Sequence, residues 1–114
     1  SLCHMSAPEA KASYELEIET RLKKQELYQL FLNWAITGNV DGIIVGATYP
    51  KIISYCKKSI HGKLSIFSPG VGTQGGSASK AKKLGSDYLI VGRTILNSKH
   101  PVKTAKDLVV DTTI

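Results

Sequence analysis

The fold is decided by residues 41–48, which read DGIIVGAT, and by a similar stretch at residues 87–94, which reads DYLIVGRT. In both stretches an Asp precedes a short apolar run and a Gly follows it. The first run, residues 42–46, is bounded by glycines, which predicts a strand buried on both faces, as in a parallel sheet. The offset of 46 residues between the two stretches indicates that the chain repeats one strand–helix unit.

Three more strands are predicted around the first one, at residues 2–5, 64–67 and 88–91. Helices are predicted in the intervals between them. Pro50 opens a helix that ends at His61-Gly62, and its buried face holds Ile52, Ile53, Cys56 and Ile60. Ser77 or Ser79 caps a helix that ends at Leu84, and a final helix runs from about Pro101 to Val110.

The interval between the first two strands is longer. Residues 9–37 contain neither Gly nor Pro, which predicts helix throughout, with a break near Lys23 and Lys24 that separates a short first helix from the main one. Gly38-Asn39 ends the main helix. Helical spacing predicts one buried face on it, made of Leu27, Leu30, Phe31, Trp34 and Ala35.

Alternating strands and helices predict a parallel sheet covered by helices, either doubly wound or part of a (β/α)₈ barrel. Chain length decides between these two folds. A barrel of about 250 residues uses about 31 residues for each strand–helix unit, so this chain holds just under four units. We therefore expect residues 1–114 to form a single domain that is half of a (β/α)₈ barrel and is incomplete alone.

The composition fits such a domain, since 42% of the residues are hydrophobic and 21% are charged, which excludes a disordered chain. The apolar runs are too short for a transmembrane helix. Two cysteines, Cys3 and Cys56, are too few for a disulfide scaffold; they predict small core side chains and a cytoplasmic protein. The net charge of +6 comes from scattered Lys residues and gives only weak support for nucleic-acid binding.

Candidate site residues follow the last two strands. The loop at residues 68–76 holds four of the ten glycines, so its backbone N–H groups can approach an anion closely. After the next strand, Gly92 and Arg93 stand at a helix start, where free amides and a guanidinium favour phosphate. The loops after the last two strands of a barrel are the usual phosphate site. The sequence therefore predicts a phosphate site made by Gly75, Gly76, Gly92 and Arg93.

Other residues have weaker functional interpretations. Ser6 follows the first strand. It either faces the same end of the barrel as the glycine-rich loop or caps the next helix. Gln74 is an exposed loop residue or a ligand contact. The three histidines lack the spacing of metal ligands. Asp41 and Asp87 precede strands, so they lie at the end of a barrel where residues contribute to stability and not to catalysis. Five Lys residues are expected on solvated helix faces: Lys11, Lys23, Lys24, Lys57 and Lys58.

The loop SPGVGTQGG at residues 68–76, followed by VGRTI at residues 91–95, resembles the archaeal type of orotidine 5′-monophosphate decarboxylase. Residues 41–50 and the Met-Ser-Ala-Pro stretch at residues 5–8 resemble other segments of its C-terminal half. The resemblance implies a (β/α)₈ barrel, a homodimer, and decarboxylation of orotidine 5′-monophosphate to uridine 5′-monophosphate in pyrimidine biosynthesis. It also implies that no cofactor or metal takes part.

Carried over position by position, the resemblance assigns the phosphate to Gln74, Gly92 and Arg93. It assigns a hydrogen bond with the pyrimidine to Ser6 and the wall of the base pocket to Pro69. The family's catalytic Asp-x-Lys-x-x-Asp motif has no counterpart among the Asp residues of this sequence. The resemblance therefore implies a substrate-binding half without catalytic residues, inactive alone and partnered by the N-terminal half of the barrel.

Two alternatives remain open from the sequence. One is another phosphosugar lyase of the same superfamily, such as a keto-gulonate phosphate decarboxylase or a hexulose phosphate synthase, which generally lack the loop around Gln74. The other is a basic half-barrel without catalytic activity that binds nucleic acid or protein. In the favoured interpretation the four strands pair in sequence order, and Ser6, Thr48, Pro69 and Arg93 lie at one rim.

Overall fold

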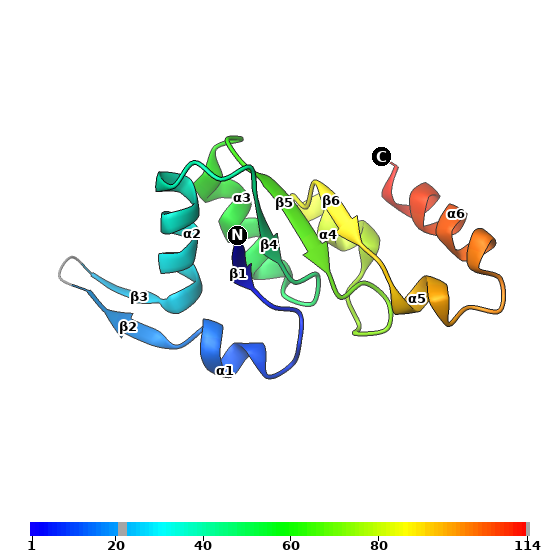
Figure 1. Ribbon diagram of the computed structural model, residues 1–114, viewed down its shortest axis with the longest axis horizontal. Coiled ribbons are helices and arrows are strands. Elements are labelled where there is room, and N and C mark those ends of the chain that lie inside the picture. Colours follow the sequence, from blue (N-terminus) through cyan, green and yellow to red (C-terminus); the bar gives the residue numbers. More distant parts are fainter. Residues whose placement is uncertain (21–22, 114) are drawn as a thin grey trace.

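The computed structural model describes residues 1–20 and 23–113. Figure 1 labels the elements along the chain. They are β1 (Leu2–His4), α1 (Ala10–Tyr14), β2 (Glu17–Glu19), β3 (Lys24–Glu26), α2 (Leu27–Thr37), β4 (Gly42–Val45), α3 (Pro50–Ile60), β5 (Ser65–Pro69), α4 (Ala78–Leu84), β6 (Tyr88–Ile90), α5 (Arg93–Leu96) and α6 (Pro101–Thr112).

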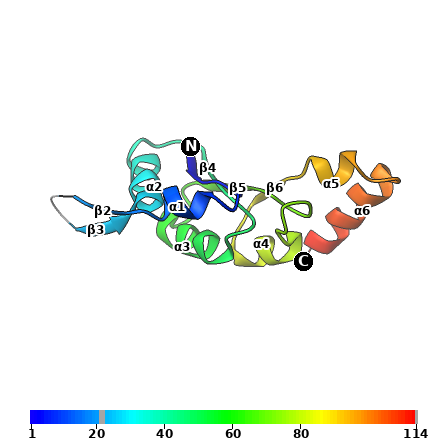
Figure 2. The same ribbon diagram turned by 90° about the horizontal axis from the view of Figure 1, so that it is seen from below.

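Four of the strands form one parallel sheet in the order β1-β4-β5-β6. This confirms the predicted strands, their parallel direction and their sequential pairing. Helices α3 and α4 lie together beneath the sheet in Figure 2. The opposite face of the sheet is turned toward the viewer in Figure 1, and no helix of the described residues crosses it.

The covered face of the sheet holds the core. Ile43, Val45 and Ile66 have no accessible surface, and they pack with the buried side of α3. As predicted, that side is made of Ile52, Ile53, Cys56 and Ile60. The helix ends at His61, which adopts the left-handed conformation with φ of +49°. At the start of α4, the hydroxyl of Ser77 accepts a hydrogen bond from the N–H of Lys80, as the sequence predicted for a capping Ser.

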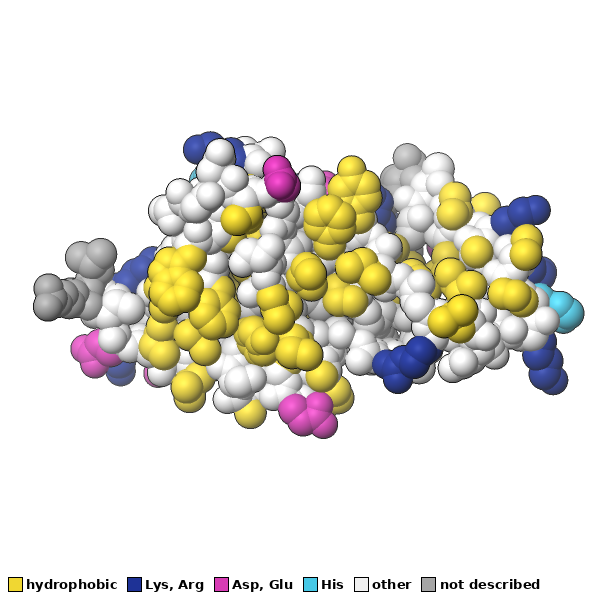
Figure 3. All heavy atoms as spheres, in the orientation of Figure 1, with side chains coloured by type: hydrophobic (Ala, Val, Ile, Leu, Met, Phe, Trp, Pro, Cys, Tyr) yellow, Lys and Arg dark blue, Asp and Glu magenta, His cyan; other side chains and the backbone are white. Residues whose placement is uncertain are grey.

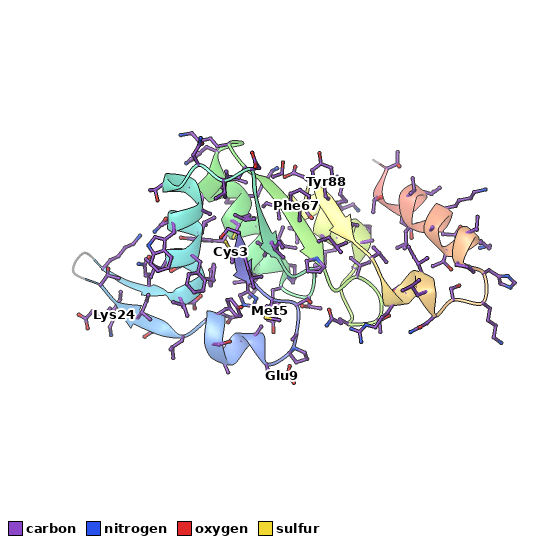
Figure 4. The ribbon with its side chains drawn as sticks, in the orientation of Figure 1. Cys3, Met5, Glu9, Lys24, Phe67 and Tyr88 are labelled. Carbon is purple, nitrogen blue, oxygen red and sulfur yellow. The ribbon has the colours of Figure 1, made fainter. Side chains whose placement is uncertain are left out.

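The uncovered face carries one apolar row across all four strands. Register pairs Leu2 with Ile44, Ile44 with Phe67, and Phe67 with Tyr88, so these four side chains lie side by side. The rings of Phe67 and Tyr88 stack with centroids 4.8 Å apart (Figure 4). The strand at residues 42–46 is thus buried on one face only, because the described residues supply helices for one face.

The prediction of helix throughout residues 9–37 is wrong between α1 and α2. There β2 and β3 form an antiparallel hairpin that pairs Glu17 with Glu26 and Glu19 with Lys24. Alternation of polar and apolar side chains around Ile18 competes with the helical period here. Helix α2 then starts at a capping box, in which Glu26 and Gln29 exchange side-chain and backbone hydrogen bonds.

The buried face of α2 also differs from the prediction. Tyr28, Leu32 and Ala35 are buried, whereas Leu27, Leu30 and Phe31 are only partly buried and Trp34 is 58% exposed. Apolar side chains surround most of this helix, so periodicity alone could not select the face that meets the sheet. Figure 3 shows hydrophobic side chains gathered over α2 and over the uncovered face of the sheet.

The chain ends in two helices beyond β6. Four-residue α5 follows Gly92 directly, and α6 begins at Pro101, as predicted. None of the helices within residues 1–20 and 23–113 is both long and apolar enough to span a membrane.

Candidate functional site

The carboxyl ends of the sheet strands carry the candidate site. A pocket of about 220 Å³ lies where the loop after β5 meets the start of α5. Its lining consists of Pro69, Gly70, Val71, Thr73, Gln74, Ile90, Gly92, Arg93 and Thr94. Four predicted site residues are therefore brought together here, namely Pro69, Gln74, Gly92 and Arg93.

Ser6 reaches this pocket through Gln74. The Ser6 hydroxyl donates a 2.6 Å hydrogen bond to Oε1 of Gln74, and the Thr48 hydroxyl donates a 2.8 Å bond to the Ser6 carbonyl. The loops after β1, β4 and β5 are thus joined at one rim, as predicted for Ser6, Thr48 and Pro69. Ser6 does not cap α1, because the residue at that position is Glu9.

The N–H groups of Gly75 and Gly76, which were predicted as anion donors, make hydrogen bonds inside the loop in this structure. The Gly75 N–H donates to the Gly72 carbonyl at 2.7 Å, and the Gly76 N–H donates to the Gly70 carbonyl at 3.0 Å. Both groups are engaged in folding the loop on itself, a closure that composition could not reveal. They therefore shape the loop, and the charged donor next to it is Arg93.

Two glycines in this loop are required by close approach. Gly70 has φ of +89°, and a Cβ there would lie 2.5 Å from Cβ of Ser6 and 2.8 Å from Oε1 of Gln74. Gly72 has φ of +77°, and a Cβ there would collide with the side chain of Thr94. Only Gly combines this backbone conformation with the absence of a side chain.

Thr94 has a role that the sequence did not predict. Its hydroxyl donates to the Val71 carbonyl at 2.9 Å and accepts from the Thr73 N–H at 3.1 Å. The loop after β5 is thereby tied to the first turn of α5, next to Arg93. A hydroxyl residue directly after the Arg of a strand-end Gly-Arg pair was the available signal.

The electrostatics of the pocket depend on Arg93. Its guanidinium is a permanent charge with a planar set of donors suited to phosphate oxygens. Helix α5 has four residues, so its dipole adds little to that charge. Together with the amide of Gln74, these groups can bind a phosphate and orient the molecule attached to it.

Asp87 lies at the opposite end of β6 and has a structural role. Its carboxylate accepts from the Ile66 N–H at 2.8 Å and from Nζ of Lys57 at 2.9 Å. Partial burial alone would raise the pKa of Asp87, but the Ile66 and Lys57 bonds outweigh it and lower that pKa. Lys57 was predicted to lie on a solvated face and instead forms this half-buried ion pair. Lys23 and Lys24 are exposed as predicted, but they belong to the hairpin region.

Both cysteines are core residues, as predicted. Burial raises the pKa of the Cys3 thiol to about 11 and that of the Cys56 thiol to about 12, so both stay protonated at neutral pH. Within the stretches that the structure describes, no three His, Cys, Asp or Glu side chains form a group suited to a metal ion.

Comparisons with known proteins bear on the family and the fold of the chain. The family model described as Orotidine 5′-phosphate decarboxylase / HUMPS family matches residues 1–108. The orotidine 5′-phosphate decarboxylase of Methanococcoides burtonii is 43% identical over 74 residues, which are 65% of this chain and 34% of that protein. The Thermococcus kodakarensis enzyme of the same name is 46% identical over 67 residues, 59% of this chain and 32% of that protein.

Solved structures give the same result for the fold. The orotidine 5′-monophosphate decarboxylase of Sulfolobus solfataricus superposes with a TM-score of 0.77 at 27% identity, covering 97% of this chain and 46% of that one. The Pyrococcus horikoshii OT3 enzyme gives 0.74 at 32% identity, covering 97% and 49%. The chain spans about a third of the curated relatives above and about half of these barrels. Since the family match extends over residues 1–108, the chain belongs to the orotidine 5′-phosphate decarboxylase / HUMPS family.

Proposed function

We propose that this chain is the C-terminal, substrate-binding half of an orotidine 5′-phosphate decarboxylase barrel. In the proposed reaction, the bond between the pyrimidine ring and the carboxylate of orotidine 5′-monophosphate breaks. Carbon dioxide leaves, a proton takes its place, and the product is uridine 5′-monophosphate. The observation that carries the proposal is the pocket in which Gln74, Gly92 and Arg93 meet.

Each pocket group has a defined part in this proposal. The guanidinium of Arg93 donates charge-assisted hydrogen bonds to the 5′-phosphate, and the backbone N–H of Gly92 adds a neighbouring donor. Gln74 uses its oxygen for the Ser6 hydroxyl, so its NH₂ group is left to donate to the nucleotide. Ser6 faces the pyrimidine beside Gln74, and Pro69 forms the wall of the base pocket. Binding the phosphate holds the distant reacting carboxylate in place, which is how remote binding energy contributes to rate.

The proposed partner is the N-terminal half of the same kind of barrel. The row of Leu2, Ile44, Phe67 and Tyr88 supports it, because an apolar row on an open sheet face is covered in a closed barrel. Leu2 is 42% exposed and Tyr88 is 56% exposed in the described chain. Strands β1 and β6 stand at the two ends of the sheet order, where further strands would pair.

Catalysis is assigned to that partner half. The sequence has no Asp-x-Lys-x-x-Asp segment, the motif that the family resemblance associates with decarboxylation. The chain alone is therefore proposed to bind nucleotide without turning it over. The assembled enzyme is proposed to be a cytoplasmic homodimer that uses no cofactor.

The test is reconstitution. The chain is mixed with the N-terminal half of the Methanococcoides burtonii enzyme, and loss of orotidine 5′-monophosphate is followed by its ultraviolet absorbance. Turnover by the mixture, none by either half, and uridine 5′-monophosphate binding by the chain alone are expected. A chain that neither binds this nucleotide nor supports turnover overturns the proposal, and turnover by the pure chain overturns the assignment of catalysis.

A second candidate follows from the family description, which names the HUMPS branch beside the decarboxylases. In that case the phosphate pocket is the same, but the substrate is a sugar phosphate. The Ser6–Gln74 bond favours the nucleotide, because it places an amide beside the phosphate pocket, where a pyrimidine carbonyl can accept from it. Competition between uridine 5′-monophosphate and ribulose 5-phosphate for the chain distinguishes the two candidates.

A further inference from the structure

Strand β1 contains an irregularity just before the loop that carries Ser6. Leu2 pairs with Ile44 and His4 pairs with Val45, so β1 uses two residues where β4 uses one. Such a bulge redirects side chains. Cys3 and His4 are both fully buried, whereas strict alternation would turn His4 to the open face together with Leu2.

The redirected His4 ring is enclosed by aromatic side chains from α1, from α2 and from the residue just before α3. Its centroid lies 4.3 Å from that of Tyr49, 5.4 Å from Tyr14 and 5.9 Å from Tyr28. Its Nδ1 is 2.8 Å from the Met5 carbonyl, and its Nε2 is 3.2 Å from Oε1 of Glu15. Both ring nitrogens of this buried histidine are therefore engaged.

The Met5 contact defines the role of one ring nitrogen. A carbonyl only accepts, so Nδ1 must donate to Met5. Nε2 lies 3.2 Å from Oε1 of Glu15, within hydrogen-bond distance. The pair is thus a fixed bridge between the end of β1 and the end of α1.

The bridge lies at one end of the loop formed by residues 5–8. Tyr49, whose ring packs on His4, donates from its hydroxyl to the Ala7 carbonyl at 2.9 Å and to the Pro8 carbonyl at 3.2 Å. His4 holds the start of the loop through Met5, and it supports the Tyr49 ring that holds the far end. Between these two anchors, Ser6 presents its hydroxyl to Gln74.

We infer that His4 and Glu15 are positioning residues for the nucleotide site. They fix the loop at residues 5–8 so that Ser6 and Gln74 stay in contact at the edge of the phosphate pocket. The inference rests on the proposed function, because the Ser6–Gln74 contact matters for nucleotide binding only if that pocket takes a nucleotide. Neither residue is part of the pocket lining, so the effect is transmitted through the loop.

Substitutions separate positioning from a general structural role. His4→Phe keeps an aromatic ring among the tyrosines and loses both hydrogen bonds. Glu15→Ala leaves Nε2 without its partner. Glu15→Gln restores the bridge, because the amide N–H donates to Nε2 while Nδ1 still donates to Met5. Glu17→Gln, an exposed carboxyl on β2, is the matched control.

Two measurements on the full chain test the inference. The first is hydrogen exchange of the Ser6 backbone amide and the Gln74 side-chain amide by NMR, which needs no ligand. The second is the dissociation constant for uridine 5′-monophosphate compared with that for inorganic phosphate. His4→Phe and Glu15→Ala are expected to speed exchange and to weaken the nucleotide about tenfold. Inorganic phosphate is expected to lose less affinity than the nucleotide, because Gly92 and Arg93 do not depend on the loop at residues 5–8.

Glu15→Gln and Glu17→Gln are expected to behave as the original chain in both measurements. Unchanged exchange at Ser6 and Gln74 in folded His4→Phe and Glu15→Ala overturns the inference, and so does equal weakening of nucleotide and phosphate. A starting chain that binds neither ligand contradicts the proposed function instead, and the exchange measurement still decides the role of the bridge.

Discussion

Ser6 and Gln74 are 68 positions apart in the sequence, and the hydroxyl of one donates a 2.6 Å hydrogen bond to the side-chain oxygen of the other. This bond joins the loops that follow the first and third strands of the sheet. It also fixes the orientation of the Gln74 amide, whose NH₂ group must then point to other acceptors. The contact depends on Gly70, where any Cβ would approach both side chains closely.

Arg93 is expected to distinguish nucleotides by their phosphate. Arg93→Ala should weaken uridine 5′-monophosphate binding ten- to a hundredfold, since a charge-assisted hydrogen bond contributes about 1.5–3 kcal/mol. Binding of uridine should barely change, because the nucleoside offers Arg93 no anion. Calorimetric titration with both ligands measures the difference.

The matched control for Arg93 is Lys99→Ala, which removes an exposed positive charge beyond α5. It should leave both affinities unchanged. Equal losses for nucleoside and nucleotide in a folded Arg93→Ala chain would mean that Arg93 is structural and the phosphate lies elsewhere.

Gly72 is expected to be intolerant of any side chain. Gly72→Ala combines an unfavourable φ of +77° with a collision against Thr94, and should lower the free energy of unfolding by about 2–4 kcal/mol. Gly62 has nearly the same φ, +75°, with open space around it. Gly62→Ala should therefore cost only about 1 kcal/mol. Urea denaturation of both variants gives the comparison, and equal losses would show that the Thr94 contact is unimportant.

Local signals in the sequence predicted the elements that those signals control. Helix α3 formed as predicted because Pro50 starts it, His61-Gly62 ends it, and one apolar stripe leaves a single face to bury. The rim also formed as predicted, because the ends of parallel strands meet at one edge of a sheet whatever the loops contain.

The failures lie where two signals compete or where a contact is distant. The segment around Ile18 satisfies both strand alternation and the absence of helix breakers, and the capping box at Glu26 decided against one long helix. The engaged amides of Gly75 and Gly76 depend on how the loop closes. The pairing of His4 with Glu15 requires a bulge in β1 that no short sequence pattern predicts.

Asp87 is expected to make folding depend on acid pH. Its pKa is lowered in the folded chain, so its contribution to stability is fully present above the unfolded value of about 3.9. That contribution is lost as the pH falls through the lowered folded value. Its side chain is 34% exposed, so solvent screening limits the contribution to about 1 kcal/mol.

The measurement is urea unfolding between about pH 5 and pH 2. Asp87→Asn should reduce the loss of stability over this range by about that 1 kcal/mol. The control is Asp107→Asn, because Asp107 pairs with Lys103 on the exposed surface of α6, where solvent screening leaves an ion pair little effect on stability. Identical pH profiles for the original chain and Asp87→Asn would contradict the assignment.

Tyr88 is expected to matter for assembly more than for the fold of the chain itself. It ends the apolar row on the uncovered face of the sheet and is 56% exposed, so a charge at this position stays in water while the chain is alone. Tyr88→Lys should cost the chain only the stacking with Phe67, about 1 kcal/mol. If the N-terminal half covers this face, the ammonium must be buried without a partner, which should weaken association at least a hundredfold.

Tyr55→Lys is the matched control, because Tyr55 also contacts an aromatic ring, that of Tyr28, but lies on α3 beneath the opposite face. Light scattering of each variant mixed with the N-terminal half measures association. Equal binding by both variants would mean that the partner does not cover the apolar row of Leu2, Ile44, Phe67 and Tyr88.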